Sequence, residues 1–446
     1  MKILFLDIYK SSPTRVSKDT AGGYGTENLL GKGLFASTAQ RLIKNGVFWP
    51  NLGFMHAVNE AHAQNHHVKY EKILHSDLFK IDGLQKYDFI FICSSLVCFE
   101  TEIRAAEDLS LRLPLTPIAL LGQISVELIS KIPSQLHVIG GNYEYIFANK
   151  STLDNLLASF SKGRTVIYKT DIAEVLNLIP IEWKLFGGGF NNKLFSKKKS
   201  YPVLVGRGCP YSCIEYCSYP VSQGRKAHFQ HLKNTIDSLN KIAEEDPNGH
   251  LIFRDPVFTI NRTRALELLR TMASANLPLT STVELHLKNC DSEVIEALRA
   301  AKVTHAKFGI ESSSELIRGS SGRYSVSNDE QKKTIENLKS AGIVTDGMFI
   351  LGMPSDDEQS MNDTVNYACN LGLDYAQFSI FTPYPGTSSF HKMQSDLTFD
   401  RFEQLNQFSS QFKHKKLTAE LIHRTMYLAY FKFYKNKISR VIGLLK

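Results

Sequence analysis

The sequence predicts an α/β protein with two sheets: a doubly wound, Rossmann-like parallel sheet, then a partial (β/α)6, TIM-like barrel and a helical C-terminal region. Apolar runs alternate with helical stretches over residues 1–185, and a segment rich in glycine, asparagine and lysine breaks this alternation at 186–200. A second series of strand–helix units fills 201–392, and 393–446 has helical periodicity without a strand signal. We therefore expect two domains joined by a linker, followed by a helical tail.

In the first section, short apolar runs end in polar or glycine-containing turns, and helical stretches such as 101–113 and 149–160 follow them. Continuous apolar strands between helices are typical of a parallel sheet that is covered on both faces. Such sheets bind ligands at the carboxyl ends of their strands. The expected strands are KILFLDIY (2–9), VKYEKIL (68–74), YDFIFICSS (87–95), PIALLG (117–122) and LHVIGG (136–141).

In the second section, helical patterns separate six apolar segments of strand length. Repeated strand–helix units in one series predict a partial α/β barrel, whose chemistry lies at the carboxyl ends of the strands. The expected strands are 202–208, 250–255, 281–287, 305–311, 346–354 and 375–383.

The composition is that of an ordinary soluble protein: 446 residues, 43% hydrophobic, 22% charged, with a net charge of +8. No run of about 18 apolar residues is present, so we expect no transmembrane segment. The start, MKILFLDIY, is too short for a secretory signal and is interpreted as a buried strand. Lysines and arginines gather at 413–446 and in SKKKS (196–200). They indicate either a solvated surface or a surface for an anionic partner, such as a lipid headgroup, a phosphorylated substrate or nucleic acid.

Seven cysteines are present, and four of them are scattered through apolar or helical context (Cys93, Cys98, Cys290 and Cys369). This pattern argues against a disulfide framework and favours the reducing cytoplasm, with peripheral membrane contact through the basic tail as an alternative. The other three lie in GRGCPYSCIEYCSYP, with the spacing Cys209-x3-Cys213-x3-Cys217. A structural zinc site is disfavoured because no fourth Cys or His lies at a zinc-finger spacing. Three clustered thiolates suit an iron–sulfur cluster better, with one iron left open to a ligand that is not protein.

The segment RGCPYSC…YCSYP resembles the signature of the radical S-adenosylmethionine (SAM) superfamily. The resemblance implies that Cys209, Cys213 and Cys217 hold a 4Fe–4S cluster whose open iron binds SAM, and that an external donor of the flavodoxin or ferredoxin type reduces it. Cleavage of SAM would then give a 5′-deoxyadenosyl radical. The family places an aromatic residue before the last cysteine, as Tyr216 does here. One departure is the second spacing, x3 instead of x2, and Glu215 is interpreted as the inserted residue.

Further motifs at the ends of predicted strands support this resemblance, which covers about 200–390: FRDPVFT, FGIES, FILGMP and TPYPGT. The resemblance implies that Glu311 lies near the SAM ribose and that the FILGMP backbone contacts adenine. The cofactor-binding candidates from these motifs are Arg254, Gly309, Glu311, Gly352, Met353, Pro354 and Pro383. Charged residues expected to face the barrel lumen are Arg254, Glu284 and Lys307, which would meet SAM or substrate or pair with each other.

The first section resembles the cobalamin-binding domain that precedes the barrel in one subgroup of this superfamily. The supporting segments are AGGYGTENLLGKG (21–33), 47–68, ICSSLVC (92–98), ALLGQIS (119–125) and VIGGNYEYIF (138–147). Glycine lets the backbone approach a flat macrocycle closely. The resemblance implies cobalamin contacts at Gly23, Tyr24, Ser94, Ser95, Leu96, Gly122, Gly140 and Gly141.

The Asp-x-His-x-x-Gly turn that supplies a histidine to cobalt in other proteins is missing, since Tyr9 stands at the position of the histidine. Bound cobalamin would therefore lack a histidine ligand from this turn, and the alternative is a Rossmann-like domain without the cofactor. The histidines His66, His67, His286 and His305 are interpreted as structural.

Three functions are compatible with these observations. The first is a cobalamin-dependent radical SAM enzyme that methylates an unactivated carbon through the deoxyadenosyl radical and methylcobalamin. The second is a radical rearrangement or cyclisation without methyl transfer, and the third is a non-catalytic iron–sulfur or cobalamin-binding protein. A tRNA methylthiotransferase is disfavoured because the first section has too few cysteines, and no nucleic acid partner is expected. The substrate, small-molecule or lipid-like, and the oligomeric state are not indicated by the sequence.

Overall fold

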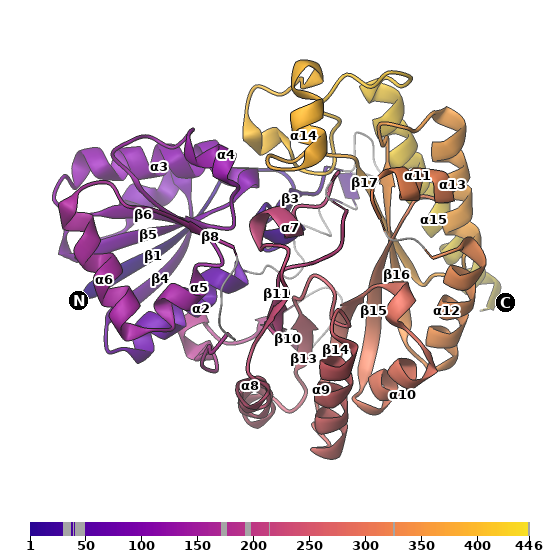
Figure 1. Ribbon diagram of the computed structural model, residues 1–446, viewed down its shortest axis with the longest axis horizontal. Helices are drawn as coiled ribbons and strands as arrows, with labels where there is room; N and C mark the ends of the chain where they lie inside the picture. Colours follow the sequence, from indigo (N-terminus) through magenta and orange to yellow (C-terminus); the bar gives the residue numbers. More distant parts are fainter. Residues whose placement is uncertain are drawn as a thin grey trace.

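The computed structural model describes residues 1–29, 37, 38, 40, 50–170, 176–191, 198–213, 215–323 and 326–444, and the side chains at 191 and 436–444 lie outside the description. Two sheets lie next to each other, and helices cover their outer faces (Figure 1). The chain completes the first sheet before it begins the second, as the alternation of apolar runs predicts.

The first sheet has six parallel strands, and the order β4-β1-β5-β6-β7-β8 makes it doubly wound. Its last strand, β8, was not expected from the sequence. The strands are β4 (His67–Leu74), β1 (Lys2–Tyr9), β5 (Phe89–Ser94), β6 (Ile118–Gly122), β7 (His137–Gly141) and β8 (Val166–Lys169).

Alternate side chains of these strands pack on opposite helical layers, as the two-residue period of a strand requires. In β1, Leu4 and Leu6 pack with α3 (Phe99–Arg112), whereas Ile3 and Phe5 pack with α2 (Leu52–Ala63), α5 (Glu144–Phe147) and α6 (Lys150–Ser159). Both faces are therefore apolar, which explains why the inner strands β1, β5, β6 and β7 are mostly hydrophobic, whereas the edge strand β4 is partly exposed and carries charged residues.

The second sheet contains six parallel strands that curve into a half-barrel, preceded by one short antiparallel strand. Its order is β17-β16-β15-β14-β13-β10-β9. The strands are β9 (Phe190–Asn191), β10 (Lys199–Val203), β13 (His250–Phe253), β14 (Thr280–Leu285), β15 (Val303–Glu311), β16 (Val344–Leu351) and β17 (Tyr375–Ile380). The helices that follow them are α8 (Leu232–Glu245), α9 (Arg262–Ser274), α10 (Ser292–Ala300), α12 (Asn328–Ser340) and α13 (Glu358–Asn370).

The expected first strand of the half-barrel, 202–208, was wrong in its extent. The chain leaves the sheet after β10, and β11 (Gly206–Arg207) instead pairs antiparallel with β12 (His228–Phe229). The turn that follows needs glycine at Gly208, where φ is +82° and a Cβ would lie 2.1 Å from the carbonyl oxygen of Lys226. The cysteine loop is therefore carried by a small hairpin rather than by the barrel strand itself.

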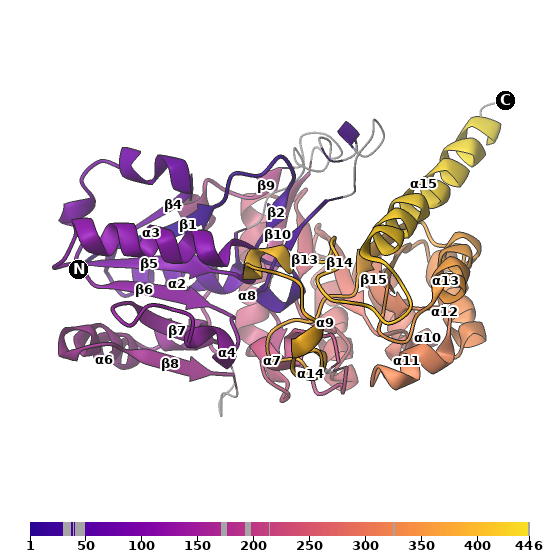
Figure 2. The ribbon, with the colours of Figure 1, turned by 90° about the horizontal axis from the view of Figure 1, so that it is seen from above.

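The tail is helical only in its second half, since most of 393–418 is irregular and α15 spans Ala419–Leu444. The phenolic oxygens of Tyr430 and Tyr434 accept hydrogen bonds from the backbone of β17 and donate to it: Tyr430 contacts Phe378 N and O, at 3.1 and 2.9 Å. Because β17 is an edge strand, these tyrosines satisfy backbone groups that would otherwise be open to another strand. Figure 2 shows that α15 then extends past the barrel.

The segment predicted as a linker contributes the strand β9, which pairs with Lys199 and Ser200 at the start of β10. Most of the basic segment SKKKS remains within the description, whereas 192–197 lies outside it. Among the described helices, none combines the length and the apolar character that crossing a bilayer requires.

Candidate functional site

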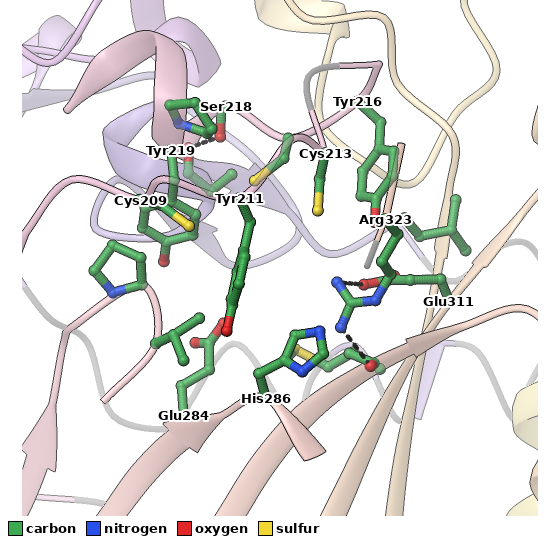
Figure 3. Close-up of a pocket in the computed structure, with 18 of the residues that line it drawn as sticks. Cys209, Tyr211, Cys213, Tyr216, Ser218, Tyr219, Glu284, His286, Glu311 and Arg323 are labelled. Carbon is green, nitrogen blue, oxygen red and sulfur yellow. Dashed lines mark hydrogen bonds and ion pairs between the residues drawn. The ribbon is translucent and has the colours of Figure 1, made fainter. Parts of the chain in front are cut away.

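A cavity lies at the carboxyl ends of the half-barrel strands, and all three clustered cysteines line it (Figure 3). Its wall also includes Glu284 from β14, Glu311 from β15 and Met348 from β16. Ala21, which belongs to the first section of the chain, completes the wall. Residues from both sections thus form one site.

The cysteine loop is held by backbone hydrogen bonds. The amide of Cys209 donates to Gly224 O at 3.0 Å, and the amide of Cys217 donates to Cys213 O at 2.9 Å. The second bond has the i to i+4 pattern of a helical turn, which brings Cys213 and Cys217 onto one face. The extra residue between these cysteines is therefore compatible with two thiols on the same side of the loop.

Burial raises the pKa of all three thiols, to about 11 for Cys209, and the neighbouring thiols add to the effect at Cys217. Protonated thiols do not bind metal, so a bound cation would be needed to hold them as thiolates. Within the ranges that the structure describes, no three Cys, His, Asp or Glu side chains converge at the spacing of metal ligands. Binding a cluster would require the three side chains to rotate toward one another. The donor set itself, three thiols on one cavity wall, fits a cluster with one open iron.

A buried ion pair lies beside the cysteines. Arg323 Nη1 contacts Glu311 Oε1 at 2.9 Å, and Arg323 Nη2 donates to Gly309 O at 2.7 Å. Glu311 ends β15 with a φ of +68°, a left-handed conformation that a residue other than glycine adopts at some strain. Burial raises the pKa of Glu311, and the Arg323 guanidinium opposes the rise. Glu311, Gly309 and Tyr216, which the sequence motifs indicated, all line the cavity, and so does Arg323, which they did not indicate. No motif marks that arginine, which is placed by the loop after α11 (Glu315–Ser320).

The opposite wall carries Glu284 and His286, with Tyr211 of the cysteine loop between them and the thiols (Figure 3). Burial raises the pKa of Glu284 to about 7, against the lowering effect of Arg254 and Lys307. Asn289 Nδ2 donates to Tyr211 Oη at 2.9 Å and fixes the ring. Glu284, which was expected to face the barrel lumen, and His286, which was interpreted as structural, thus both line the cavity.

Other selected residues do not line this cavity. Arg254 turns to the first section instead, where its Nε donates to Asp19 Oδ2 at 2.7 Å. Met353 N donates to Asp356 Oδ2, and Met353 O accepts from His414 Nε2, both at 2.8 Å. Gly352 lies against Ile422 of α15. Neither Pro354 nor Pro383 reaches the wall, although Tyr384, the neighbour of Pro383, does.

At the carboxyl edge of the first sheet, the selected glycines lie against the protein's own atoms. A Cβ at Gly23, where φ is +93°, would lie 2.4 Å from Gln123 Oε1, and one at Gly122 would lie 2.4 Å from Ser94 O. The other two contact β8: Gly140 lies against Tyr168, and Gly141 against Lys169 O.

Three polar atoms on neighbouring strand ends are buried and, within the described residues, have no hydrogen-bond partner. They are Ser94 Oγ at the end of β5, Gln123 Nε2 after β6 and Asn142 Oδ1 after β7. Buried polar atoms are normally paired. The edge therefore has unmet capacity for a polar ligand. Parts of the supporting segments, 30–33 and 47–49, lie outside the described residues.

Beside these atoms, a fully buried ion triad lies next to Tyr9, the residue at the position where other cobalamin-binding proteins have a histidine. Lys18 Nζ lies 2.9 Å from Asp7 Oδ1 and 2.8 Å from Glu102 Oε1, and 4.5 Å from the centre of the Tyr9 ring. Ser95 also contacts Glu102 through its amide and hydroxyl, at 2.8 and 3.0 Å. Tyr9 is thus enclosed by charged groups.

Several contacts join the two sections around the cavity. Ser218 Oγ donates to Ala21 O at 2.6 Å, Ser222 Oγ donates to Gly22 O at 2.8 Å, and Tyr24 Oη donates to Pro385 O at 2.8 Å. A buried pair, Arg207 Nε to Glu144 Oε1 at 2.6 Å, links the cysteine hairpin to α5. Tyr24 and Leu96 are buried at this junction rather than exposed to a ligand.

The sequence model of the family described as "Radical SAM superfamily" matches residues 203–368, which contain the cysteine loop and the strands from β13 to β16. Residues 203–368 thus match the radical SAM superfamily, as the cysteine loop and the strand-end motifs indicate. Members of this superfamily use a 4Fe–4S cluster and SAM.

Similar curated proteins include an uncharacterized methyltransferase of Pyrococcus horikoshii, 27% identical over 52% of this chain and 50% of that protein. Others are the bacteriochlorophyllide d C-12(1)-methyltransferase of Chlorobaculum tepidum (24% identical, 51% of both chains) and the anaerobic magnesium-protoporphyrin IX monomethyl ester cyclase of Cereibacter sphaeroides (27%, 52% and 38%). The chain spans about half the length of the first of these relatives, and less of the cyclase.

Two solved structures share the fold across both sections. The radical SAM methyltransferase TsrM from Kitasatospora setae, with tryptophan and a SAM analogue bound, gives a TM-score of 0.61 at 12% identity, covering 88% of this chain and 76% of that one. The cobalamin-dependent SAM radical enzyme OxsB, with aqua-cobalamin and SAM bound, gives 0.61 at 9% identity, covering 96% and 65%. These likenesses confirm the predicted fold class.

Proposed function

We propose that the protein is a cobalamin-dependent radical SAM enzyme that transfers a methyl group to an unactivated carbon. The observation that carries this proposal is the composition of the cavity wall: three cysteines and the Glu311–Arg323 pair from the half-barrel, closed by Ala21 from the first section. A cavity that both sections form suits a reaction between one ligand bound by the half-barrel and another bound by the first section. The names of the similar proteins, mostly methyltransferases, support the same reaction class.

Cys209, Cys213 and Cys217 would hold the cluster, which together with SAM supplies a carbon-centred radical when bound. Glu311 and Arg323 would bind and orient polar groups of SAM, because they are a buried carboxylate and guanidinium on the same cavity as the thiols. Tyr216 covers the loop next to this pair and limits the access of water.

Cobalamin would lie at the carboxyl edge of the first sheet and supply the methyl group. The unpartnered atoms of Ser94, Gln123 and Asn142 would then bind its polar side groups. The chain offers no histidine at Tyr9, and Lys18 beside Tyr9 is held by Asp7 and Glu102. Cobalt would therefore take no protein ligand from this turn.

The substrate would place an uncharged group in the cavity. Apart from Glu284 and His286, the wall away from the thiols carries neutral side chains, namely Met348, Ile350, Gln377, Ser379 and Gln407, and the Arg323 guanidinium is already paired with Glu311. A small or lipid-like molecule suits this surface better than a nucleic acid does.

A second reaction is favoured by one observation. Magnesium-protoporphyrin ester cyclases match this chain about as well as the methyltransferases do, so a radical cyclisation without methyl transfer is the alternative. The cysteine loop and the SAM residues would serve either reaction.

Anaerobic reconstitution with iron and sulfide tests the proposal. The protein should gain the visible absorbance of a 4Fe–4S cluster and, with a reductant and SAM, release 5′-deoxyadenosine. Added hydroxocobalamin should remain bound through gel filtration. Products one methylene heavier than the substrate support methyl transfer, and products of altered mass without that gain support the alternative. Absence of both the cluster and 5′-deoxyadenosine would contradict the enzyme class.

A further inference from the structure

Glu215, the residue by which the second cysteine spacing exceeds the usual one, has three partners on a single helix. Its Oε1 accepts from Ser388 Oγ at 3.1 Å and lies 2.7 Å from Lys392 Nζ, and its Oε2 accepts from Ser389 Oγ at 3.0 Å. All three partners belong to α14 (Ser388–Lys392), which follows the TPYPGT motif. The cysteine loop is thereby joined to an element that lies 173 to 177 residues further along the chain.

The turn geometry explains why this side chain points away from the thiols. Cys213 and Cys217 are joined by an i to i+4 backbone hydrogen bond, so their side chains share one face of the turn. A residue two positions after Cys213 lies about 200° around a helical turn, on the opposite face. Glu215 therefore faces α14 while the cysteines face the cavity.

The helix that receives Glu215 is itself fixed on two further sides. Its N-cap residue Thr387 donates from Oγ1 to Tyr384 O at 2.7 Å, and Tyr384 lines the cavity. His391 Nε2 lies 3.3 Å from Glu127 Oε1 of α4 (Val126–Ile129) in the first section. Through α14, Glu215 therefore connects the cysteine loop both to the cavity wall and to the first section.

Glu215 also forms an ion pair with Lys392, whose Nζ lies 2.7 Å from Glu215 Oε1. The ion pair is partly exposed, with Glu215 23% and Lys392 66% accessible, so the two serine hydroxyls contribute more to the anchor than Lys392 does.

We propose that Glu215 is a positioning residue for the cluster: by anchoring the Cys213–Cys217 turn to α14, it fixes where these two thiols stand and offsets the one-residue longer spacing. The inference rests on the proposed function, because it assumes that the thiols hold a cluster. Groups that hydrogen-bond metal ligands and orient them typically change metal affinity about 10–100-fold when they are removed. Glu215 acts on the ligands through the backbone of their turn, so we expect an effect at the lower end of this range.

The test compares Glu215→Ala, Glu215→Gln and Lys392→Met with the wild-type chain, using two measurements. One is the rate at which the reconstituted protein loses iron to a chelator under anaerobic conditions. The other is the rate at which iodoacetamide alkylates Cys213 and Cys217 in the metal-free protein. Glu182→Ala is the matched control, because Glu182 is also partly exposed and also pairs with a lysine, Lys241, at 2.9 Å.

Glu215→Ala should lose iron about tenfold faster than wild type and should expose the two cysteines to faster alkylation. Glu215→Gln keeps an acceptor for the serine hydroxyls and should lie within about threefold of wild type, and Lys392→Met and Glu182→Ala should stay near it. Circular dichroism shows whether the variants are folded. If Glu215→Ala does not fold, Glu215→Gln can still be compared with the wild-type chain.

Two results would overturn the inference: equal rates in Glu215→Ala and Glu182→Ala, or no difference between Glu215→Gln and Glu215→Ala. A failure of the proposed function is distinguishable. In that case the wild-type chain takes up no cluster, while the alkylation rates in the metal-free protein still decide whether Glu215 anchors the turn.

Discussion

The two sheets present their polar residues at the same place, the carboxyl ends of parallel strands, but they use them differently. In the half-barrel these ends surround a cavity, and Cys209, Glu284 and Glu311 line its wall. In the first sheet the corresponding edge is covered by the segment from Lys10 to Leu29, and Lys18 fills it as part of a buried ion triad. The half-barrel edge is thus open to a ligand as it stands, whereas the first edge is held closed by its own charges.

The two edges therefore differ in which features of a binding site exist before a ligand binds. The SAM side offers preformed space and preformed charge pairs. The other side offers three unpartnered polar atoms and tightly packed glycines, so a large ligand there would have to displace part of the covering segment. Because the two edges share none of these residues, substitutions can test each edge separately.

The largest effect is expected at the open edge. Cys213→Ala removes one of three thiols, so the reconstituted protein should lose the cluster absorbance and all 5′-deoxyadenosine formation. Cys369→Ala, a thiol on α13 away from the cavity, should retain both. Visible spectra and chromatography of the nucleoside product measure the two properties, and a fully active Cys213→Ala protein would remove this cysteine from the site.

A substitution at the closed edge should change the stability of the protein rather than its activity. Lys18→Met leaves Asp7 and Glu102 as buried charges without their cation, and breaking such a group typically lowers the free energy of unfolding by about 3–5 kcal/mol. Lys233→Met removes an exposed pair with Asp237 and should change it by less than about 0.5 kcal/mol. Urea unfolding followed by circular dichroism measures both. Equal stabilities would mean that the triad does not hold the edge closed.

A smaller effect is expected from Glu284, on the open edge. Burial raises its pKa to about 7 in the folded protein, so the folded state takes up a proton that the unfolded state does not. The stability from this uptake is fully present below the ordinary pKa of glutamate and is lost as the pH rises through about 7. The free energy of unfolding of Glu284→Gln should therefore equal that of wild type near pH 4.5 and exceed it by about 1–3 kcal/mol at pH 8. Melting temperatures at both pH values test this, with exposed Glu267→Gln as the control; a constant difference would refute it.

The smallest effect is expected from Ser94→Ala on the closed edge, and Ser95→Ala at the adjacent serine serves as the comparison. Ser94 Oγ is unpartnered and Ser95 Oγ donates to Glu102, so in the ligand-free protein Ser94→Ala should change the free energy of unfolding by less than about 0.5 kcal/mol and Ser95→Ala should lower it by about 1.5–3 kcal/mol. Hydroxocobalamin should bind less tightly to Ser94→Ala than to wild type, as equilibrium titration would measure. Unchanged binding would place the Ser94 hydroxyl outside the cobalamin contacts.

Sequence patterns predicted the fold well because each buried strand is a short apolar run and each helix has its own period. The cysteine loop and Glu311 could be located from local motifs, since these residues are adjacent in sequence to the strands that carry them. Arg323 and Ala21 could not. Arg323 reaches Glu311 from a loop after α11, and Ala21 arrives from the other domain, so only the folded chain brings them to the cavity.

The differences between the predicted and the observed elements have a similar cause, namely contacts with distant parts of the chain. The chain after Val203 is apolar enough to continue β10, but it pairs with β12 instead, a partner 21 to 23 residues away that no local pattern reveals. The tail from 393 to 418 contains apolar residues at helical spacing, yet Phe408 and Phe412 pack into the barrel clusters as irregular chain. The partners of Glu215 on α14 lie still further along the sequence, which is why only its position as an insertion was evident.

The short stretch from Asp19 to Tyr24 forms hydrogen bonds with four groups of the half-barrel section: Arg254, Ser218, Ser222 and the carbonyl of Pro385. A truncated chain that starts near residue 200 would keep its cysteines but lose one side of the chamber they face. Solvent would then reach the three cysteines from that side, so the half-barrel by itself would not keep the cavity enclosed.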